Sequence, residues 1–286
     1  MFDAAIIGTG PAGLSAALNL KIHQKSFIWL GSKSLSKKIQ KAEKVMNYPG
    51  LSNVTGEEML ESFLKQVEDM KLDISEEMVN SIMFLGDHYY LMAGSNVYEA
   101  KTIILATGIT NVGRIIGEEN LVGKGVSYCA TCDGMLYRGK TISVISNSNR
   151  FEHEVEYLSN LAEKVYFFPT YKDYKISKNN IEVYNTKPTA IMGEKKVEGI
   201  ELNDGSKVEI DGIFCLRDSI ALSTLLPDLK LDDGHMAVNR KMETNLQGCF
   251  AAGDCTGRPY QYTKAVGEGN IAAHSLIEYL AKEEKR

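Results

Sequence analysis

The sequence has no long apolar run and no surplus of basic residues, and each absence excludes a class of protein. No apolar stretch among the 286 residues is long enough to span a bilayer, and residues 3–7 predict a strand with no leader-like segment before it. We therefore expect a cytoplasmic protein with no membrane partner. The formal net charge of −5 disfavours nucleic-acid binding, because no basic surplus is present to displace counterions from phosphates.

Cysteine is also sparse. The five cysteines are Cys129, Cys132, Cys215, Cys249 and Cys255. An odd and thinly spread set in a reducing compartment is more typical of free or catalytic thiols than of a disulfide framework. A structural zinc site usually needs two pairs of ligands at matching spacing, whereas the other cysteines and the five histidines are scattered. We therefore predict no metal site.

What the chain does contain is enough apolar sequence for two cores, together with a nucleotide-binding pattern. The apolar fraction of 44% suits two domains. Residues 4–20 predict a buried strand, a glycine turn and a helix, and residues 26–30 predict the next strand. In this G-x-G-x-x-G turn, Gly8 allows the tight bend, Gly10 lets a pyrophosphate approach the backbone, and Gly13 lets the helix pack close to the strand. This unit is predicted to bind a dinucleotide.

The same unit recurs 138 residues later. Residues 141–168 again predict strand, turn, helix and strand, so the chain is built from two copies of one architecture. In the repeat, Ser146, Ser148 and Phe151 stand where the first unit has its three glycines, and three glutamates follow in the helix. Side chains at these positions block the approach of a pyrophosphate, and the glutamates repel its charge. The turn is therefore predicted to be empty, the alternative being a divergent loop that still binds a nucleotide.

Between the two units lies a Cys-x-x-Cys segment in residues 125–140. Cys129 and Cys132 are followed directly by Asp133. A two-residue spacer can close a small disulfide ring, and a helix starting near the second cysteine would favour its thiolate. Asp133 is the obvious proton donor, because no histidine is near in sequence; a helix N-cap role for the same side chain remains open.

Six motifs together resemble one family, the low-molecular-weight, FAD-containing thioredoxin reductases. They are Gly8–Gly13, NYPG (47–50), ILATG (104–108), CATCDG (129–134), GCFAAGDCTG (248–257) and GEGNIAA (267–273). The resemblance covers essentially the whole chain.

The resemblance implies an α/β fold of two Rossmann-like domains of the FAD/NAD(P)-binding type, the second inserted in the first. The FAD domain is expected at 1–111 and 242–286, and a small NADPH-domain-like redox domain at 112–241. A homodimer that reduces thioredoxin is the family expectation.

The resemblance also assigns roles to individual residues. Asn47 contacts the flavin, Asp254 binds the ribityl chain, and Gln261 opens a helix that supports the charge of reduced flavin. Cys132 faces the flavin, and Cys129 attacks the disulfide of thioredoxin with Asp133 handling the proton. The complete implied FAD site is Gly8, Gly10, Pro11, Ala12, Gly13, Asn47, Thr107, Gly108, Gly253, Asp254, Gln261 and Tyr262.

The chain departs from the family where NADPH should bind. The second glycine loop, GGGDSA in the family, is SNSNRF here, and the basic clamp HRR falls at FPT (168–170). Tyr260 replaces the arginine usual before Gln261. These losses favour the subgroup that resembles flavin thioredoxin reductases fed by ferredoxin, in which a flavin gathers single electrons for a two-electron disulfide. The alternatives are an NAD(P)H-dependent disulfide reductase with an atypical nucleotide site and a non-enzymatic flavin redox sensor.

A lysine-rich stretch offers a place for an acidic ferredoxin to dock. Residues 21–44 hold seven lysines, among them Lys37, Lys38 and Lys41, against one glutamate. The hypothesis is that this patch steers ferredoxin by charge, and the alternative is an ordinary solvated surface.

Overall fold

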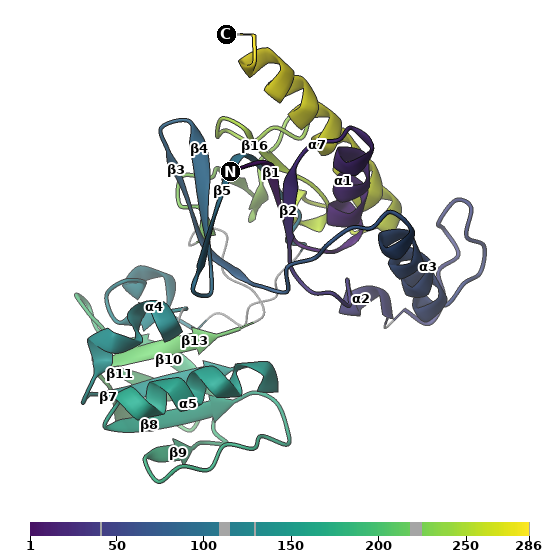
Figure 1. Cartoon of the computed structure of the whole chain (residues 1–286). Helices are drawn as coiled ribbons and strands as arrows, with labels where there is room; N and C mark the ends of the chain where they lie inside the picture. The colour runs from purple at the N-terminus through teal and green to yellow at the C-terminus, as the bar shows by residue number, and fades with distance from the viewer. Residues whose placement is uncertain (41, 109–114, 129, 218–224, 286) are drawn as a thin grey trace. The chain divides into compact units, whose positions relative to one another are not determined.

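The computed structural model describes residues 1–286 except 41, 109–114, 129, 218–224 and 286, and the side chains of 37, 38, 119 and 132 also lie outside the description. The chain divides into two compact units, one of Met1–Thr110 with Leu226–Arg286 and one of Asn111–Leu225 (Figure 1). The second unit is thus inserted in the first, and the predicted α/β class is confirmed.

The first unit is built on a six-stranded sheet in the order β2-β1-β5-β4-β3. The sixth strand, β16, pairs with the last three residues of β5, whereas β4 pairs with the first half of β5. Its strands are β1 (Phe2–Ile7), β2 (Phe27–Leu30), β3 (Val79–Leu85), β4 (His88–Ala93), β5 (Asn96–Leu105) and β16 (Cys249–Ala251). Strands β1, β2, β5 and β16 run parallel, and β3 and β4 form an antiparallel hairpin next to β5. The parallel part has its carboxyl ends at one edge, where the predicted cofactor turn begins.

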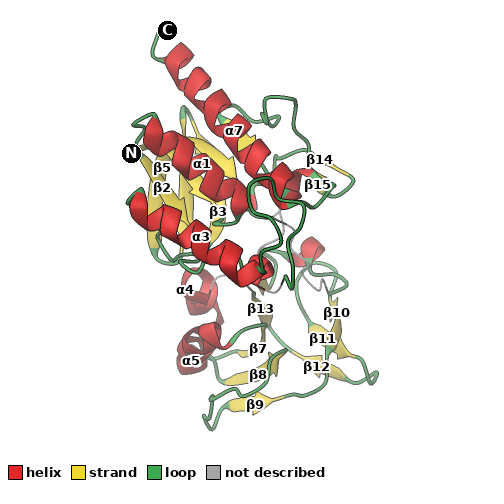
Figure 2. Cartoon of the chain, turned by 90° about the vertical axis from the view of Figure 1, so that its right-hand side faces the viewer, coloured by secondary structure: helices red, strands yellow, loops and turns green. Residues whose placement is uncertain are grey.

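Three helices of the first unit cover one face of this sheet (Figure 2). They are α1 (Pro11–Ile22), α3 (Gly56–Asp69) and α7 (Tyr262–Glu283), and a short α2 (Lys37–Gln40) precedes α3. Helix α3 begins with a capping box, in which Thr55 accepts from the backbone N–H of Glu58 and the Glu58 carboxylate accepts from the N–H of Thr55. The buried faces of α1, α3 and α7 form one apolar core with the sheet, and Trp29 is among its largest fully buried side chains.

The second unit has a five-stranded parallel sheet in the order β6-β13-β7-β8-β9. Its strands are β6 (Val126–Ser127), β7 (Thr141–Ser146), β8 (Lys164–Pro169), β9 (Ile181–Val183) and β13 (Gly212–Leu216). An antiparallel sheet of β10 (Pro188–Met192), β11 (Gly199–Leu202) and β12 (Lys207–Glu209) follows β9 in the chain. The helical segments are η1 (Glu119–Leu121), α4 (Ala130–Asp133), η2 (Gly134–Tyr137), η3 (Asn149–Phe151) and α5 (Glu152–Leu161). Each unit therefore has its own parallel strand-turn-helix-strand element, in agreement with the repeat.

The chain returns to the first unit at Leu226, earlier than the expected boundary at 242. The hairpin of β14 (Leu231–Asp232) and β15 (His235–Met236) belongs to this unit. Asn245 holds the segment at its start, because its side-chain oxygen accepts from the Lys230 N–H at 2.7 Å and its amide donates to the Asp228 carbonyl at 2.9 Å. Local sequence gave no sign of these side-chain bonds.

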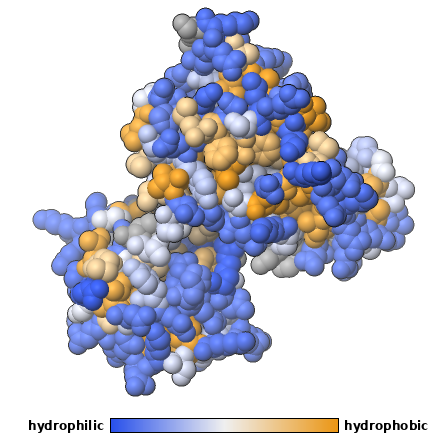
Figure 3. Space-filling model, viewed as in Figure 1, coloured by the Kyte–Doolittle hydropathy of each residue, from blue (hydrophilic) through white to orange (hydrophobic). Residues whose placement is uncertain are grey.

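Apolar side chains also reach the surface of the first unit. Met83, Phe84 and Leu85 of β3 are exposed, and Figure 3 shows apolar surface around this strand and its neighbours. Within the described residues, none of the helices combines the length and apolar character needed to cross a membrane.

Candidate cofactor and dithiol site

The turn between β1 and α1 is shaped by two glycines that the chain itself requires. Gly8 has φ of 110°, and a Cβ there would lie 2.2 Å from the Ala106 carbonyl oxygen. A Cβ on Gly13 would lie 2.0 Å from the Gly8 carbonyl oxygen. The Trp29 indole N–H donates to the same oxygen at 2.9 Å, which fixes the turn against β2. Neither position can accept a side chain without moving the backbone.

Gly10 is different, because nothing in the described chain needs it to be glycine. It precedes α1 with extended backbone, and a Cβ there would meet no atom within 4 Å beyond its chain neighbours. Pro11 then occupies the first helical turn, where a missing N–H costs nothing. A position without a side chain before a helix start that has no side-chain cap is the cradle that a pyrophosphate requires. The turn therefore fits the phosphates of a dinucleotide.

The loop after β16 packs against this turn. Gly253 has φ of 91°, and a Cβ on it would lie 3.0 Å from the Cβ of Ala12 in α1. Asp254 follows directly and begins the short helix η4 (Asp254–Thr256). The structure thus brings Ala12, Gly253 and Asp254 together from segments more than two hundred residues apart in sequence, as the resemblance implies.

Asn47 and the start of α7 meet as well. The Asn47 side-chain amide donates to the Gln261 side-chain oxygen at 2.7 Å, and Gln261 is the N-cap of α7. The pKa of Tyr262, the first residue of that helix, is raised by burial and by the negative charge of Asp254. The predicted flavin and ribityl contacts are therefore neighbours in space.

Thr107 and Gly108 follow the carboxyl end of β5, beside the cradle strand β1. The Thr107 hydroxyl is buried and has no hydrogen-bond partner of good geometry among the described residues. A buried hydroxyl without a partner is costly, so it is a natural place for a cofactor hydrogen bond. All twelve of the residues implied to bind FAD lie in the first unit, and those described above converge at one edge of its sheet.

Two further side chains contact this site and were not singled out from the sequence. Lys264 and Glu268 of α7 form an ion pair at 2.9 Å, and both bond to the backbone of Gly253. The sequence signal for this ion pair was the spacing of four residues, which places the two side chains next to each other on one face of a helix.

The dithiol segment is described only in part. Cys129 lies outside the described residues, and so does the side chain of Cys132. The Ser127 hydroxyl donates to the Asp133 carboxylate at 2.7 Å, and the Tyr128 hydroxyl donates to the buried Glu118 at 2.9 Å. Asp133 precedes η2, yet its side chain makes no capping bond to that helix. The local geometry therefore gives no support to the N-cap alternative and leaves Asp133 anchored beside the cysteines.

The other three cysteines are free and buried. Burial is the main cause that raises the pKa of the thiols, to about 12 for Cys215, about 12 for Cys249 and about 11 for Cys255. Buried thiols with raised pKa are poor nucleophiles, so none competes with the Cys-x-x-Cys segment for redox chemistry. Over the described part of the chain, no three histidine, cysteine or acidic side chains gather in a way that could hold a metal ion.

The turn between β7 and α5 contrasts with the first turn. Phe151, which stands at the position of Gly13, is 4% exposed and belongs to the 3-10 turn η3 that replaces the first turn of an α-helix. The Ser146 hydroxyl donates to the carbonyl of Ser148 at 2.9 Å, and the Ser148 hydroxyl accepts from the N–H of Arg150 at 3.4 Å. The Ser148 hydroxyl thus takes up the Arg150 N–H, a backbone donor of the kind that binds a phosphate at a helix start.

The pairing of β7 and β8 continues one residue past β8, and the loop that follows bonds to the start of α5. Thr170, at the end of β8, donates from its N–H to the Ser146 carbonyl at 2.8 Å. Glu152 begins α5, and its carboxylate accepts from the Tyr171 hydroxyl at 2.9 Å and from the Lys175 N–H at 3.3 Å. The start of the helix thus carries a carboxylate of its own, where a nucleotide site would present free N–H groups to a phosphate.

Comparison with known proteins agrees with this geometry. Residues 2–269 match the pyridine nucleotide-disulphide oxidoreductase family, and the chain belongs to that family. Within it, the chain is 31% identical to the thioredoxin reductase of Treponema pallidum over 98% of this chain and 97% of that protein, which places it among the thioredoxin reductases.

Two solved structures illustrate the likeness. A ferredoxin-flavin thioredoxin reductase from Clostridium acetobutylicum is 45% identical with a TM-score of 0.89, covering 100% of this chain and 99% of the other. The atypical thioredoxin reductase TRi from Desulfovibrio vulgaris Hildenborough is 28% identical with a TM-score of 0.72, covering 99% of each chain. The family and the flavin reductase neighbours imply FAD as the cofactor, and the glycine cradle fits it.

Proposed function

We propose that this chain is a ferredoxin-dependent flavin thioredoxin reductase, in which electrons pass from ferredoxin through FAD and the Cys129–Cys132 disulfide to thioredoxin. Three features support the proposal: the family, the 45% identity to a ferredoxin-flavin thioredoxin reductase, and the altered second turn. When bound, FAD supplies a group that accepts single electrons and delivers them in pairs.

The observation that carries the donor assignment is the closed turn of the second unit. The Ser148 hydroxyl accepts from the Arg150 N–H, the buried Phe151 stands where the first turn has Gly13, and Glu152 places a carboxylate at the start of α5. A nicotinamide cofactor needs an open glycine turn and free helix N–H groups, and the first unit shows what such a turn looks like. The second unit keeps the parallel sheet of that fold and lacks its phosphate site.

The chain's own residues perform the disulfide chemistry in this proposal. Cys132 accepts the electron pair, and Cys129 leaves as a thiolate that attacks the disulfide of thioredoxin. Cys132 then resolves the mixed disulfide, so that reduced thioredoxin is released and the enzyme disulfide is restored. Asp133, anchored by the Ser127 hydroxyl, holds and returns the proton that each exchange requires.

The donor is tested by mixing the oxidised holoprotein anaerobically with NADPH, NADH and reduced ferredoxin in turn. Reduced ferredoxin should bleach the flavin absorbance and permit thioredoxin reduction, whereas neither nicotinamide should do so at a catalytic rate. Turnover with NADPH would instead establish the nicotinamide-dependent alternative. Flavin bleaching without any exchange with thioredoxin would favour the sensor.

The docking patch is a separate part of the proposal. Lys41 and the side chains of Lys37 and Lys38 lie outside the described residues, so the patch rests on sequence alone. Reversal of these three lysines to Glu should slow flavin reduction by ferredoxin several-fold at low salt, chiefly by lowering the association rate. The matched control reverses three exposed lysines of the second unit, Lys172, Lys195 and Lys196, which changes the net charge equally. Equal rates for the two triple variants would eliminate the patch and leave the donor assignment intact.

The homodimer belongs to the same proposal, and sedimentation of the holoprotein across a concentration series measures it directly.

A further inference from the structure

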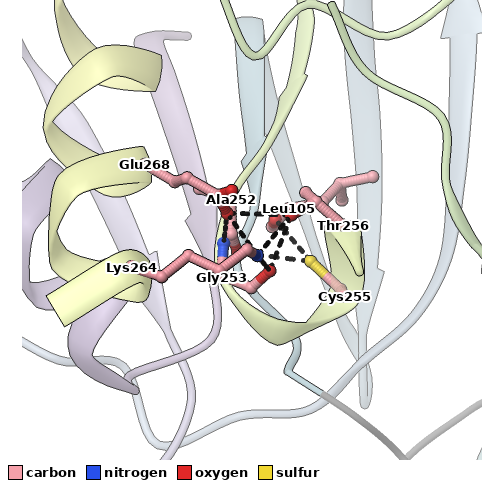
Figure 4. A network of polar contacts seen from close by, with 7 residues as sticks. All are labelled: Leu105, Ala252, Gly253, Cys255, Thr256, Lys264 and Glu268. Atoms are coloured by element: carbon pink, nitrogen blue, oxygen red, sulfur yellow. Dashed lines mark hydrogen bonds and ion pairs between the residues drawn. The ribbon is translucent and has the colours of Figure 1, made fainter. Parts of the chain in front are cut away.

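Helix α7 carries an ion pair that is directed at the loop before the helix. The ammonium of Lys264 lies 2.9 Å from the carboxylate of Glu268, one turn further along. The two side chains are only 17% and 16% exposed, unlike an ordinary surface pair (Figure 4). A pair so far withdrawn from solvent is costly to form unless each charge is fully hydrogen-bonded.

The pair holds both backbone groups of Gly253. The Lys264 ammonium donates to the Gly253 carbonyl oxygen at 2.9 Å, and the Gly253 N–H donates to the Glu268 carboxylate at 2.8 Å. Gly253 has φ of 91° and ψ of −153°, a conformation that favours glycine. The peptide groups on its two sides therefore cannot rotate without breaking a hydrogen bond to a charged group.

Thr256 ties the other end of the loop to the same pair. Its hydroxyl accepts from the Lys264 ammonium at 3.0 Å and lies 2.8 Å from the Glu268 carboxylate. The ammonium thus uses its three donors on Gly253, Thr256 and Glu268. We refer to Lys264, Glu268 and Thr256 as the loop clamp.

The place of the lysine argues that stability is not the main role of the clamp. Lys264 lies in the first turn of α7, where the helix dipole disfavours a positive charge. Apolar side chains at two such positions often serve stability as well as a buried ion pair does. What apolar side chains could not do is bond to both sides of Gly253, the residue directly before Asp254.

We propose that Lys264 and Glu268 are positioning residues for the cofactor: by holding Gly253 and Thr256, they fix Asp254 between them in the orientation that binds the ribityl chain. The inference rests on the proposed role of Asp254 and not on the identity of the electron donor. Asp254 touches the cofactor, and the clamp acts through it.

The first test compares Lys264→Met with Lys241→Met. Lys241 forms an ion pair at 2.9 Å with Glu278 of α7, and both side chains are more than half exposed; among the described residues, neither is hydrogen-bonded to Gly253 or Thr256. Release of FAD from the diluted holoprotein, followed by flavin fluorescence, should be faster by about tenfold or more in Lys264→Met, because buried charged partners lose their hydrogen bonds. Lys241→Met should release FAD at the wild-type rate. Wild-type release from Lys264→Met would overturn the proposal.

The second test separates positioning from general stability. In an Asp254→Ala background, adding Lys264→Met should change the FAD release rate by less than about twofold, because a residue that acts through Asp254 has nothing left to position. If the two effects multiply instead, the clamp does not act through Asp254 and the proposal is wrong. Should Lys264→Met purify without FAD, Thr256→Val removes a single hydroxyl of the clamp and permits the same comparison.

These outcomes are independent of the proposed function. A wild-type protein that used NADPH would refute the ferredoxin assignment and leave the release rates unchanged. Conversely, loss of coupling between Lys264 and Asp254 would refute the clamp in an enzyme that still used ferredoxin.

Discussion

The turn of the first strand-turn-helix unit contains glycines at positions 8, 10 and 13, whereas the second unit has Ser146, Ser148 and Phe151 at the equivalent positions. In the first, helix α1 starts at once at Pro11, no side chain caps it, and a Cβ on Gly10 would meet no atom within 4 Å. In the second, a 3-10 turn comes before α5, the Ser148 hydroxyl accepts from the Arg150 N–H, and Glu152 places a carboxylate at the start of the helix. The strands beneath both turns are parallel and alike. The comparison teaches that one parallel sheet arrangement can carry two turns of different chemistry, because the ladder hydrogen bonds of the strands do not depend on which side chains the turn holds.

The largest expected effect comes from the dithiol between the two turns. Cys129→Ser and Cys132→Ser should each abolish thioredoxin reduction, because exchange needs both sulfurs, and both variants should keep FAD, because the first turn is untouched. The rate of thioredoxin reduction tests the first expectation, and the flavin absorbance of the purified variants tests the second.

The two variants should also differ from each other. Cys132→Ser should form a stable mixed disulfide with a thioredoxin that lacks its resolving cysteine, detectable on a non-reducing gel. If the stable mixed disulfide forms only in the variant that lacks Cys129, the roles of the two cysteines are reversed.

A second prediction places the same side chain in the two turns. Gly10→Val adds a side chain where no described atom lies within 4 Å, so the unit should fold but bind FAD at least about tenfold more weakly, because the pyrophosphate loses its approach to the backbone. Ser148→Val in the second turn should leave FAD binding unchanged. Flavin content and the dissociation constant for FAD provide the measurement, and equal loss in both variants would contradict the assignment of the site to the first turn.

A third prediction asks whether the second turn can be reopened. Phe151→Gly should lower the free energy of unfolding of the second unit by about 3 kcal/mol or more, the usual cost of deleting a buried aromatic side chain. Restoring glycines at 146, 148 and 151 together should not give turnover with NADPH, because the basic clamp is absent from 168–170. Chemical denaturation and anaerobic mixing test the two parts. An unchanged denaturation midpoint would show that Phe151 is not part of the core.

The smallest effect concerns the edge of the first sheet opposite the turn. Asp3 lies at the start of β1; burial raises its pKa, but hydrogen bonds from Lys101 and Ser26 outweigh that effect and lower the pKa to about 2. A lowered pKa in the folded state contributes stability above the unfolded value of 3.8, and this contribution is lost as pH falls toward 2. Asp3→Asn should therefore flatten the decline of the thermal midpoint between pH 4 and pH 2. If the thermal midpoint of Asp3→Asn declines as steeply as that of the wild type, the ionisation of Asp3 does not contribute to the loss of stability at low pH.

Much of the fold followed from local patterns. The two strand-turn-helix units were predicted correctly, because buried strands and glycine turns leave periodic signals over short windows. The compact unit resumes at Leu226, whereas the resemblance placed the domain boundary at 242, and the bond between Asn245 and Lys230 joins residues that no local pattern relates. The site was predictable where a motif names its residues, as at Gly8 and Gly253, and the roles of its residues remain predictions.

The sequence by itself determined the two parallel units, the glycine turn of the first and the glycine-free turn of the second, because glycine and bulky side chains act on the backbone beside them. Only the tertiary structure decided how distant residues cooperate. It brought Asn47 to Gln261, placed Gly253 against Ala12, and aimed Lys264 and Glu268 at the loop before them. These contacts depend on where α7 packs, and packing is set by the whole core rather than by any neighbouring residue.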